Sequence, residues 1–267
     1  VKVSTSFLLV FVCMVTACDL KIRPDMLGSH DVCIKVQRYD RLESRYLTTG
    51  DFSALQQMNT DYPIETRTLI EKVLQLGVIE DFEIHKKFLR YYQDSTLQML
   101  ISDAEAEYAN MSDINKKFCK VFHQLKEWLP GLPKPQVYAQ IGSLDQSIII
   151  GEEMIGISLD KYMGEDYPLY KKYYSAEQLK SMKREYIVPD ALSFYLLSLY
   201  PLQQYDLRSQ KERDLHMAKM MWILNKAMGK DFFKTKFIDV IDKYMRRHPE
   251  IEIGDFIKSN DYHALLP

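Results

Sequence analysis

The sequence has no long apolar run and no excess of charge of either sign. Its 267 residues include 35 Lys and Arg against 37 Asp and Glu, a formal net charge of -2. A chain without a positive field has little to attract a polyanion, so we expect no nucleic-acid partner. No segment approaches the length of about 18 to 20 consecutive apolar residues that a membrane-spanning helix requires. Both absences direct attention to the short apolar segment at the start of the chain.

The first eighteen residues have the pattern of a bacterial lipoprotein signal. Lys2 precedes nine unbroken apolar residues, 7–15 (FLLVFVCMV), the length of a secretory signal core. Cys18 follows the small residue Ala17, the position at which a lipoprotein cysteine is acylated and the preceding peptide removed. We therefore expect residues 1–17 to be a signal peptide and Cys18 to carry acyl chains that anchor the protein to the envelope. No acidic run follows Cys18, which favours the outer membrane facing the periplasm; the alternative is a buried N-terminal helix with an incidental cysteine.

Recognisable catalytic motifs are also missing. The six histidines are scattered and form no HExxH pair, and neither a GxSxG elbow nor a glycine-rich phosphate loop is present. Glu212 and His216 lie four residues apart on a predicted helix, a spacing that usually gives a solvated ion pair. We expect no metal site and no cofactor.

Scarce glycine and periodic apolar residues predict a mostly helical α+β protein. There are ten glycines, and apolar residues recur at intervals of three and four on one face of a helix through Met111, Ile114, Phe118, Val121, Phe122 and Leu125. The same periodicity predicts helices at 40–58, 63–76, 83–108, 175–200, 208–228 and 231–246. Ser175 with Gln178 forms a capping-box pattern, and Gly77 and Gly229 stand where helices often end.

A small sheet is predicted between these helices. The segments 137–141, 147–150 and 154–159 are short, rich in β-branched residues and separated by glycine-containing turns, which favours an antiparallel meander. Val32, Ile34 and Val36 alternate and supply a candidate further strand, and the proline-rich segment 130–135 leads into the sheet. We therefore predict a single domain over 18–267, in which helices pack around a small antiparallel sheet.

Two cysteines would remain in the mature chain after Cys18 is acylated. Cys33 and Cys119 share no close spacing, although an oxidising compartment permits them to pair. Cys119 falls within the apolar helical segment, so the sequence favours a buried free thiol.

Two carboxylates are the candidate site residues. Asp160 ends a predicted strand, and we expect it to be structural, accepting hydrogen bonds from the backbone of the turn that continues through Gly164. Asp190 follows Pro189 near a helix start, where an N-cap or first-turn role is the ordinary interpretation. Between them, residues 162–174 hold five tyrosines, a density that favours packing over a ligand cage.

The block 157–164 (ISLDKYMG), followed by DYPLY at 166–170, resembles the I-x-LD-x-YLG signature of the GldB-type gliding-motility lipoproteins. Further matching pieces occur in the same order along the chain: 38–40 (RYD), 88–94, 138–142 (YAQIG), 188–190 (VPD), 243–245 (KYM) and 248–249 (HP). The resemblance implies an envelope lipoprotein with a role in the gliding and associated protein-secretion apparatus. Its partners would be other envelope proteins.

The same family more distantly resembles zinc-dependent peptidases, in which an active helix bears HExxH. The comparable helix here, 188–196 (VPDALSFYL), has no histidine, so the resemblance implies a zincin-like scaffold without the metal site. Three functions follow. The leading hypothesis is a non-catalytic envelope lipoprotein acting through protein contacts. The alternatives are a hydrolase or diverged metallopeptidase around Asp160 and Asp190, and a periplasmic peptide or small-molecule binding module using 162–174.

Overall fold

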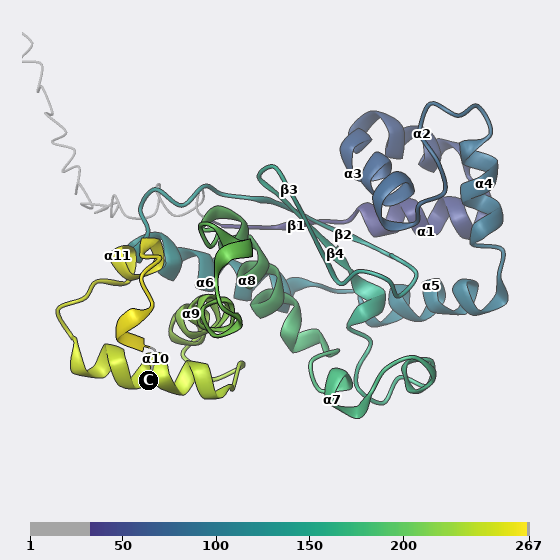
Figure 1. The fold of residues 1–267 in the computed structure, drawn as a ribbon. Helices are drawn as coiled ribbons and strands as arrows, with labels where there is room; N and C mark the ends of the chain where they lie inside the picture. Colours follow the sequence, from purple (N-terminus) through teal and green to yellow (C-terminus); the bar gives the residue numbers. More distant parts are fainter. Residues whose placement is uncertain (1–32, 266–267) are drawn as a thin grey trace, which may run out of the picture. The chain divides into compact units, whose positions relative to one another are not determined.

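The computed structural model describes residues 33–265, which combine many helices with one small sheet (Figure 1). The predicted mostly helical α+β class is confirmed. Within the described residues the strands are β1 (Val36–Gln37), β2 (Gln136–Gln140), β3 (Ile148–Gly151) and β4 (Met154–Ser158). The α-helices of the same part are α1 (Tyr39–Thr49), α2 (Phe52–Asp61), α3 (Pro63–Thr68), α4 (Ile84–Tyr91), α5 (Ser95–Glu107), α6 (Ser112–Trp128), α7 (Ala176–Leu179), α8 (Ile187–Leu199), α9 (Gln210–Met228), α10 (Lys236–Arg247) and α11 (Ile253–Lys258).

Three of the predicted helices are wrong in extent, because each is two helices. The segment 40–58 divides into α1 and α2, 83–108 into α4 and α5, and 175–200 into α7 and α8. Gly50 ends α1 with a left-handed φ of 70°, and the Asp51 side chain then caps α2 by accepting from the backbone N–H of Ser53. Asp94 caps α5 in the same way. Cap residues inside an apolar periodicity therefore decide where these helices break.

The other predicted helix-end signals have mixed outcomes. Ser175 and Gln178 form the predicted capping box, and Gly229 closes α9 with a φ of 64°. The prediction for Gly77 is wrong, because α3 passes into a π-helical turn (Leu69–Val73) that ends before it.

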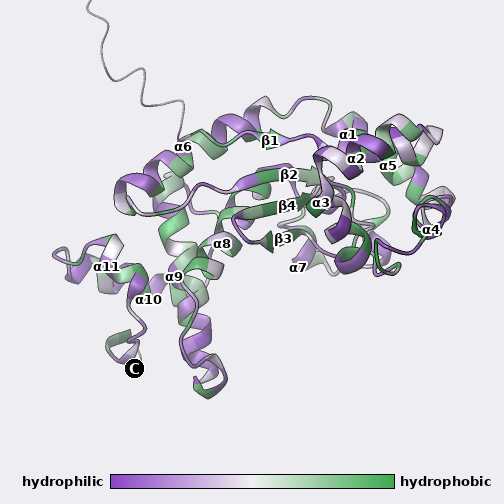
Figure 2. Ribbon diagram, turned by 90° about the horizontal axis from the view of Figure 1, so that it is seen from above, coloured by the Kyte–Doolittle hydropathy of each residue, from purple (hydrophilic) through white to green (hydrophobic). Residues whose placement is uncertain are grey.

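The sheet is mixed, so the predicted antiparallel meander is wrong. The strand order is β1-β2-β4-β3, in which β2 runs parallel to both β1 and β4, and only the β3–β4 hairpin is antiparallel (Figure 2). Tyr138 of β2 lies opposite Gly156 of β4, and a Cβ on Gly156 would lie 2.5 Å from the Tyr138 hydroxyl. Glycine at this position therefore leaves room for the Tyr138 ring to lie against β4. β1 takes in only Val36 of the predicted alternating strand, and Val32 lies outside the described residues.

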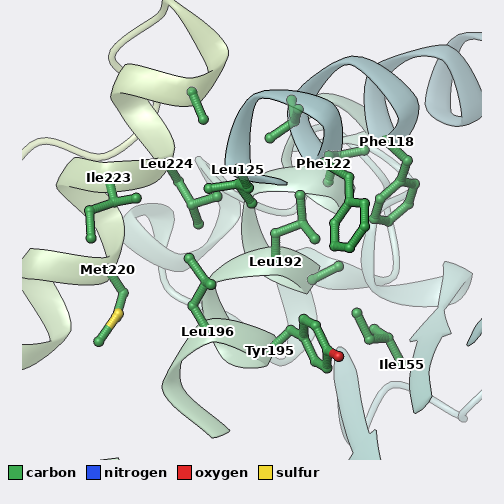
Figure 3. Close-up of a cluster of buried hydrophobic side chains, with 14 of the residues drawn as sticks. Phe118, Phe122, Leu125, Ile155, Leu192, Tyr195, Leu196, Met220, Ile223 and Leu224 are labelled. Carbon is green, nitrogen blue, oxygen red and sulfur yellow. The ribbon is translucent and has the colours of Figure 1, made fainter. Parts of the chain in front are cut away.

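The alternation of side chains along β2 and β4 divides the core between the two faces of the sheet. Val137, Ala139, Ile155 and Ile157 belong to one buried cluster with residues of α6, α8 and α9, part of which is drawn in Figure 3. On the opposite face, Tyr138 joins a second cluster formed with residues of α1, α2, α4 and α5. Period-two strands covered by helices on both sides give the domain its two-sided core.

Cys33 and Cys119 form a disulfide, which corrects the expectation of a free thiol. Cys119 stands beside the apolar stripe of α6 and is only partly buried, because its neighbour Phe118 occupies the core-facing position. The chain before β1 runs along this side of α6, where the Asn115 side chain accepts from the backbone N–H of Val36 at 2.9 Å. That contact brings two cysteines separated by 86 positions to a Cα–Cα distance of 4.4 Å.

Candidate functional site

Asp160 lies where the two central parallel strands end. Parallel pairing places the carboxyl ends of β2 and β4 at one edge of the sheet, and Asp160 follows β4 in a 3-10 turn (Leu159–Lys161). The side chain is fully buried, and its two oxygens accept from the backbone N–H groups of Gly142 at 2.7 Å and Leu144 at 2.6 Å. Burial raises the pKa of this carboxyl, and the two backbone hydrogen bonds oppose the shift.

The predicted hydrogen-bond donors to Asp160 are therefore wrong, although the carboxylate does bond to backbone N–H groups. The acceptor oxygens hold the loop after β2, whereas the turn through Gly164 supplies neither donor. The physical reason is the parallel pairing of β2 and β4, which sets the end of one strand beside the end of the other.

Glu43 is the acidic neighbour that sequence reasoning missed. It lies on α1, is fully buried, and accepts from the backbone N–H of Ile141 at 2.9 Å. Burial raises its pKa well above the ordinary value, and the negative charge of Asp160 adds to the shift. Glu43 and Asp160 therefore hold consecutive amides at the end of β2. A signal was available, because Glu43 falls between the buried Tyr39 and Tyr46 at helical spacing.

The loop after β2 is held in an unusual backbone conformation. Ser143 and Leu144 have left-handed φ values of 52° and 68°, which residues other than glycine adopt at a cost of about 1–3 kcal/mol each. The carbonyl of Leu144 accepts from the Tyr174 hydroxyl at 2.6 Å and from Lys161 Nζ at 3.2 Å. The Ser143 hydroxyl lies 2.9 Å from the hydroxyl of Tyr91. Contacts from several elements, Asp160 included, therefore keep this loop rigid.

A surface hollow of about 460 Å³ lies beside this loop. Its lining includes Leu97, Leu144, Asp145, Tyr173 and Tyr174. Tyr173 is 67% exposed, whereas other tyrosines of the 162–174 segment, Tyr162 and Tyr170, are buried. Tyr170 donates its hydroxyl to the backbone carbonyl of Asp160, so this tyrosine holds the turn that carries the carboxylate. We call Thr96, Leu97, Ser143–Asp145 and Tyr173 the loop surface; Asp145 and Tyr173 are exposed and the others are partly buried.

Asp190 lies in the first turn of α8, one of the two roles that its position near Pro189 predicts. Tyr186 precedes the helix, so Asp190 is not its N-cap. The carboxylate accepts from the Tyr162 hydroxyl at 3.0 Å, and burial raises its pKa to about 7. No hydrogen bond or ion pair among residues 33–265 joins Asp190 to Asp160, so the two candidate carboxylates do not act as a bonded pair.

Glu212 and His216 do not form the expected ion pair. Glu212 completes a capping box with Ser209 and binds Arg208 at 2.8 Å; these contacts, that of Arg208 foremost, lower its pKa to about 2. His216 is buried with Nδ1 at 2.6 Å from the Tyr262 hydroxyl, and burial lowers its pKa to about 4. The two side chains are turned to different neighbours because Glu212 serves the helix end and His216 faces the core.

Lys219, one turn along α9 from His216, is a second buried group that the sequence did not reveal. The side chain is fully buried, and its Nζ donates to the carbonyls of Ser259 at 2.6 Å and Phe256 at 3.3 Å. Burial lowers its pKa to about 7. The amine thus caps the end of α11 and ties the C-terminal segment to α9.

The described residues contain no group of three or more His, Cys, Asp or Glu side chains placed to hold a metal ion. In the same part of the chain, no helix has the length and apolarity to cross a bilayer. Cys18 and the predicted signal peptide lie outside the described residues.

Together, the mixed sheet, the helices on both its faces and the disulfide between Cys33 and Cys119 define a disulfide-bonded α+β domain. The sequence model of the family described as "Gliding motility protein GldB" matches residues 20–234. This is most of the chain, and the protein belongs to that family of envelope lipoproteins, which associates it with gliding motility. Comparisons with curated proteins and with solved structures gave no match.

Proposed function

We propose that this protein is a non-catalytic, lipid-anchored component of the envelope that acts through contacts with other proteins of a gliding or secretion apparatus. The observation that carries the proposal is the burial and hydrogen bonding of Asp160, which lies in the block that most resembles the GldB signature. Both of its oxygens bond to backbone N–H groups, and no part of the side chain reaches the surface. A carboxylate held in this way fixes the conformation of the loop that forms the surface, and neither of its oxygens is free to bind a substrate.

The loop surface is the part of the molecule that Asp160 shapes. Rigid loops bind with a smaller loss of conformational freedom than mobile ones, and exposed tyrosines are enriched at protein interfaces. Tyr173 stands exposed beside the strained pair Ser143 and Leu144, with a hollow next to it. This combination favours a preformed contact site for another protein.

Site-specific photocrosslinking in intact membranes tests the proposal. A benzoylphenylalanine at position 173 should give a discrete crosslinked species that mass spectrometry identifies as an envelope protein. The matched control is Tyr205, another surface tyrosine that is 56% exposed and lies outside the loop surface. A species of the same size and yield at both positions, or none at 173, would contradict the proposal.

The anchor is a separate part of the proposal. We infer that Cys18 carries acyl chains that hold the protein in the outer membrane facing the periplasm, with support from the family and from the disulfide. Cys18→Ala should move the protein from the membrane fraction to the soluble periplasmic fraction. Unchanged membrane retention of this variant would mean that another feature anchors the protein.

A hydrolytic function is the second candidate, favoured by Asp190. A carboxyl whose pKa is raised to about 7, next to a tyrosine hydroxyl at 3.0 Å, has the properties of a general acid or base. The purified protein would then hydrolyse a panel of ester or peptide substrates with a pH dependence that Asp190→Asn abolishes. Activity that the substitution leaves unchanged would remove Asp190 from this role.

A further inference from the structure

The sheet has an open edge at β3. The strand order ends with β3, and among residues 33–265 no strand lies on its outer side (Figure 2). Open edges present unpaired backbone donors and acceptors, and proteins usually protect them with lysine, proline, a bulge or a covering element. The strand reads Ile-Ile-Ile-Gly and carries neither lysine nor proline.

The register shows which backbone groups face outward. Ser158 donates its N–H to the carbonyl of Ser147 at 3.0 Å, so these two residues form a hydrogen-bonded pair of the antiparallel ladder. Such pairs alternate, and the next residue of β3 that bonds to β4 is therefore Ile149, opposite Gly156. The N–H and C=O groups of Ile148 and Ile150 point away from β4. No hydrogen bond within the described part of the chain occupies that outer side.

Apolar surface flanks this edge. Ile148, Ile149 and Ile150 are all only partly buried, the first and third against the cluster that contains α8 and the second against the opposite cluster. Helix α8 packs against β3 and supplies part of the cluster that Ile148 and Ile150 contact. An added strand would therefore find apolar contacts for alternate side chains as well as backbone partners.

Charge around the edge selects the kind of occupant. Asp145 precedes β3, and Glu152 and Glu153 form the turn of the β3–β4 hairpin; all three are exposed, and no basic residue occurs between positions 142 and 160. A second copy of this chain that paired antiparallel along β3 would set Glu152 and Glu153 against Asp145 of its partner. Like charges placed opposite one another disfavour that pairing. A strand with basic residues at its ends has the complementary charge.

We propose that β3 receives an extended segment of a partner protein as a fifth strand, a segment with apolar residues at alternate positions and basic residues at its ends. The inference rests on the proposed function in that the partner is a protein, and it names the binding mode and chemistry. The β3 edge shares Asp145 with the loop surface but does not include Tyr173, so the two are tested at different residues. Strand addition of this kind obtains affinity from main-chain hydrogen bonds and specificity from side chains and charge.

The first test uses a synthetic peptide, Lys-Lys-Val-Thr-Val-Thr-Val-Lys-Lys, with a fluorescent label at one end, and the protein with its disulfide intact. Binding measured by fluorescence anisotropy should be saturable and should weaken as salt is added. Three matched peptides serve as controls: one has its lysines replaced by glutamates, and two are N-methylated at alternate residues, one in each register, so that each lacks the backbone donors of one edge. Equal binding of all these peptides, or binding of none, would overturn the inference.

Hydrogen exchange followed by NMR locates the bound strand. In the free protein the amides of Ile148 and Ile150 should exchange quickly, and saturating peptide should slow them by about tenfold or more. The amide of Ile149, which already bonds to β4, should change little. Protection that does not alternate along β3 would contradict strand addition.

Two variants complete the test. Reversing the turn charges with Glu152→Lys and Glu153→Lys leaves the ladder intact and should shift preference to the glutamate peptide. Ile150→Pro removes an outward N–H, a change that edge strands tolerate, and should abolish binding; its melting temperature falls because Ile150 also packs against the core, but unfolding should remain cooperative. If these experiments fail while position 173 still crosslinks a protein, the edge inference alone is wrong; if both fail, so is the proposed function. Dimerisation lost with Ile150→Pro would instead identify a second copy as the occupant, and would also overturn the inference.

Discussion

Replacing Asp160 by asparagine changes one oxygen and one charge at the centre of the candidate site. The carboxylate accepts from Gly142 N–H at 2.7 Å and Leu144 N–H at 2.6 Å. Asparagine keeps the shape but offers only one acceptor, so its NH2 group would face one of these backbone donors. The substitution therefore removes a hydrogen bond and leaves a buried donor without an acceptor.

The expected loss of folding stability is the sum of contributions of opposite sign. A hydrogen bond to a charged group contributes about 1.5–3 kcal/mol, and an unsatisfied buried donor costs about 1–3 kcal/mol. Burial raises the pKa of Asp160, so removing the charge returns part of the desolvation penalty. We expect a net destabilisation of about 2–3 kcal/mol, which lowers the melting temperature of a chain of this size by about 4–12 °C.

Thermal and urea unfolding at pH 7 measure this loss. The matched control is Asp145→Asn, an exposed aspartate in the same loop, which we expect to change stability by less than about 0.5 kcal/mol. Faster amide exchange at Gly142 and Leu144 should accompany the loss in the Asp160 variant. A melting temperature equal to or above that of the wild type would refute the structural role and return Asp160 to the candidates for ligand binding.

Three further predictions concern groups that are buried or joined by the tertiary fold. Replacing Cys33 and Cys119 by serine should destabilise the protein by about 2–4 kcal/mol, measured by urea unfolding against the wild type with and without dithiothreitol; no difference between oxidised and reduced wild type would contradict the disulfide. For Asp190, the pKa of about 7 in the folded protein lies above the ordinary value, so wild-type stability that is present at acid pH is lost as the pH rises through 7. The free energy of unfolding of Asp190→Asn, relative to that of the wild type, should therefore rise by up to about 4 kcal/mol between pH 4 and pH 8. A difference that does not depend on pH would contradict the shift. For Lys219, the pKa of about 7 in the folded protein lies below the ordinary value, so wild-type stability falls as the pH is lowered from 10 to 7. Over that interval the free energy of unfolding of Lys219→Met, relative to that of the wild type, should rise by up to about 4 kcal/mol. Parallel curves of unfolding free energy against pH would show that the amine ionises normally.

Local signals in the sequence were sufficient where a structural feature depends on neighbouring residues. The capping box of Ser175 and Gln178 and the terminal Gly229 act within a few positions, and both appear where predicted. The three strands after residue 135 were located for the same reason, since each is a short run rich in β-branched residues beside a glycine-containing turn. Asp51 and Asp94 were equally local cap signals, but the apolar periodicity continues across both positions, so the predicted helices were too long.

Pairing between distant segments was decided by the tertiary structure alone. Whether β2 pairs with β3 or with β4 depends on how the hairpin folds back, and the close approach of Tyr138 to Gly156 belongs to the arrangement with β4. That arrangement brings Asp160 to Gly142, 18 positions earlier, and Glu43 to Ile141, 98 positions later. The cysteines meet across 86 positions for a similar reason.

The helical α+β class, the location of the strands and the family could all be inferred from the amino-acid sequence, because periodicity, caps and the ISLDKYMG block lie in consecutive residues. Folding of the whole domain was needed to show which carboxylates lie together, that Lys219 is buried without a carboxylate partner among the described residues, and that the edge of β3 is open. Burial and the choice of partner depend on segments far apart in the chain, and the free energy that selects them comes from packing the whole domain.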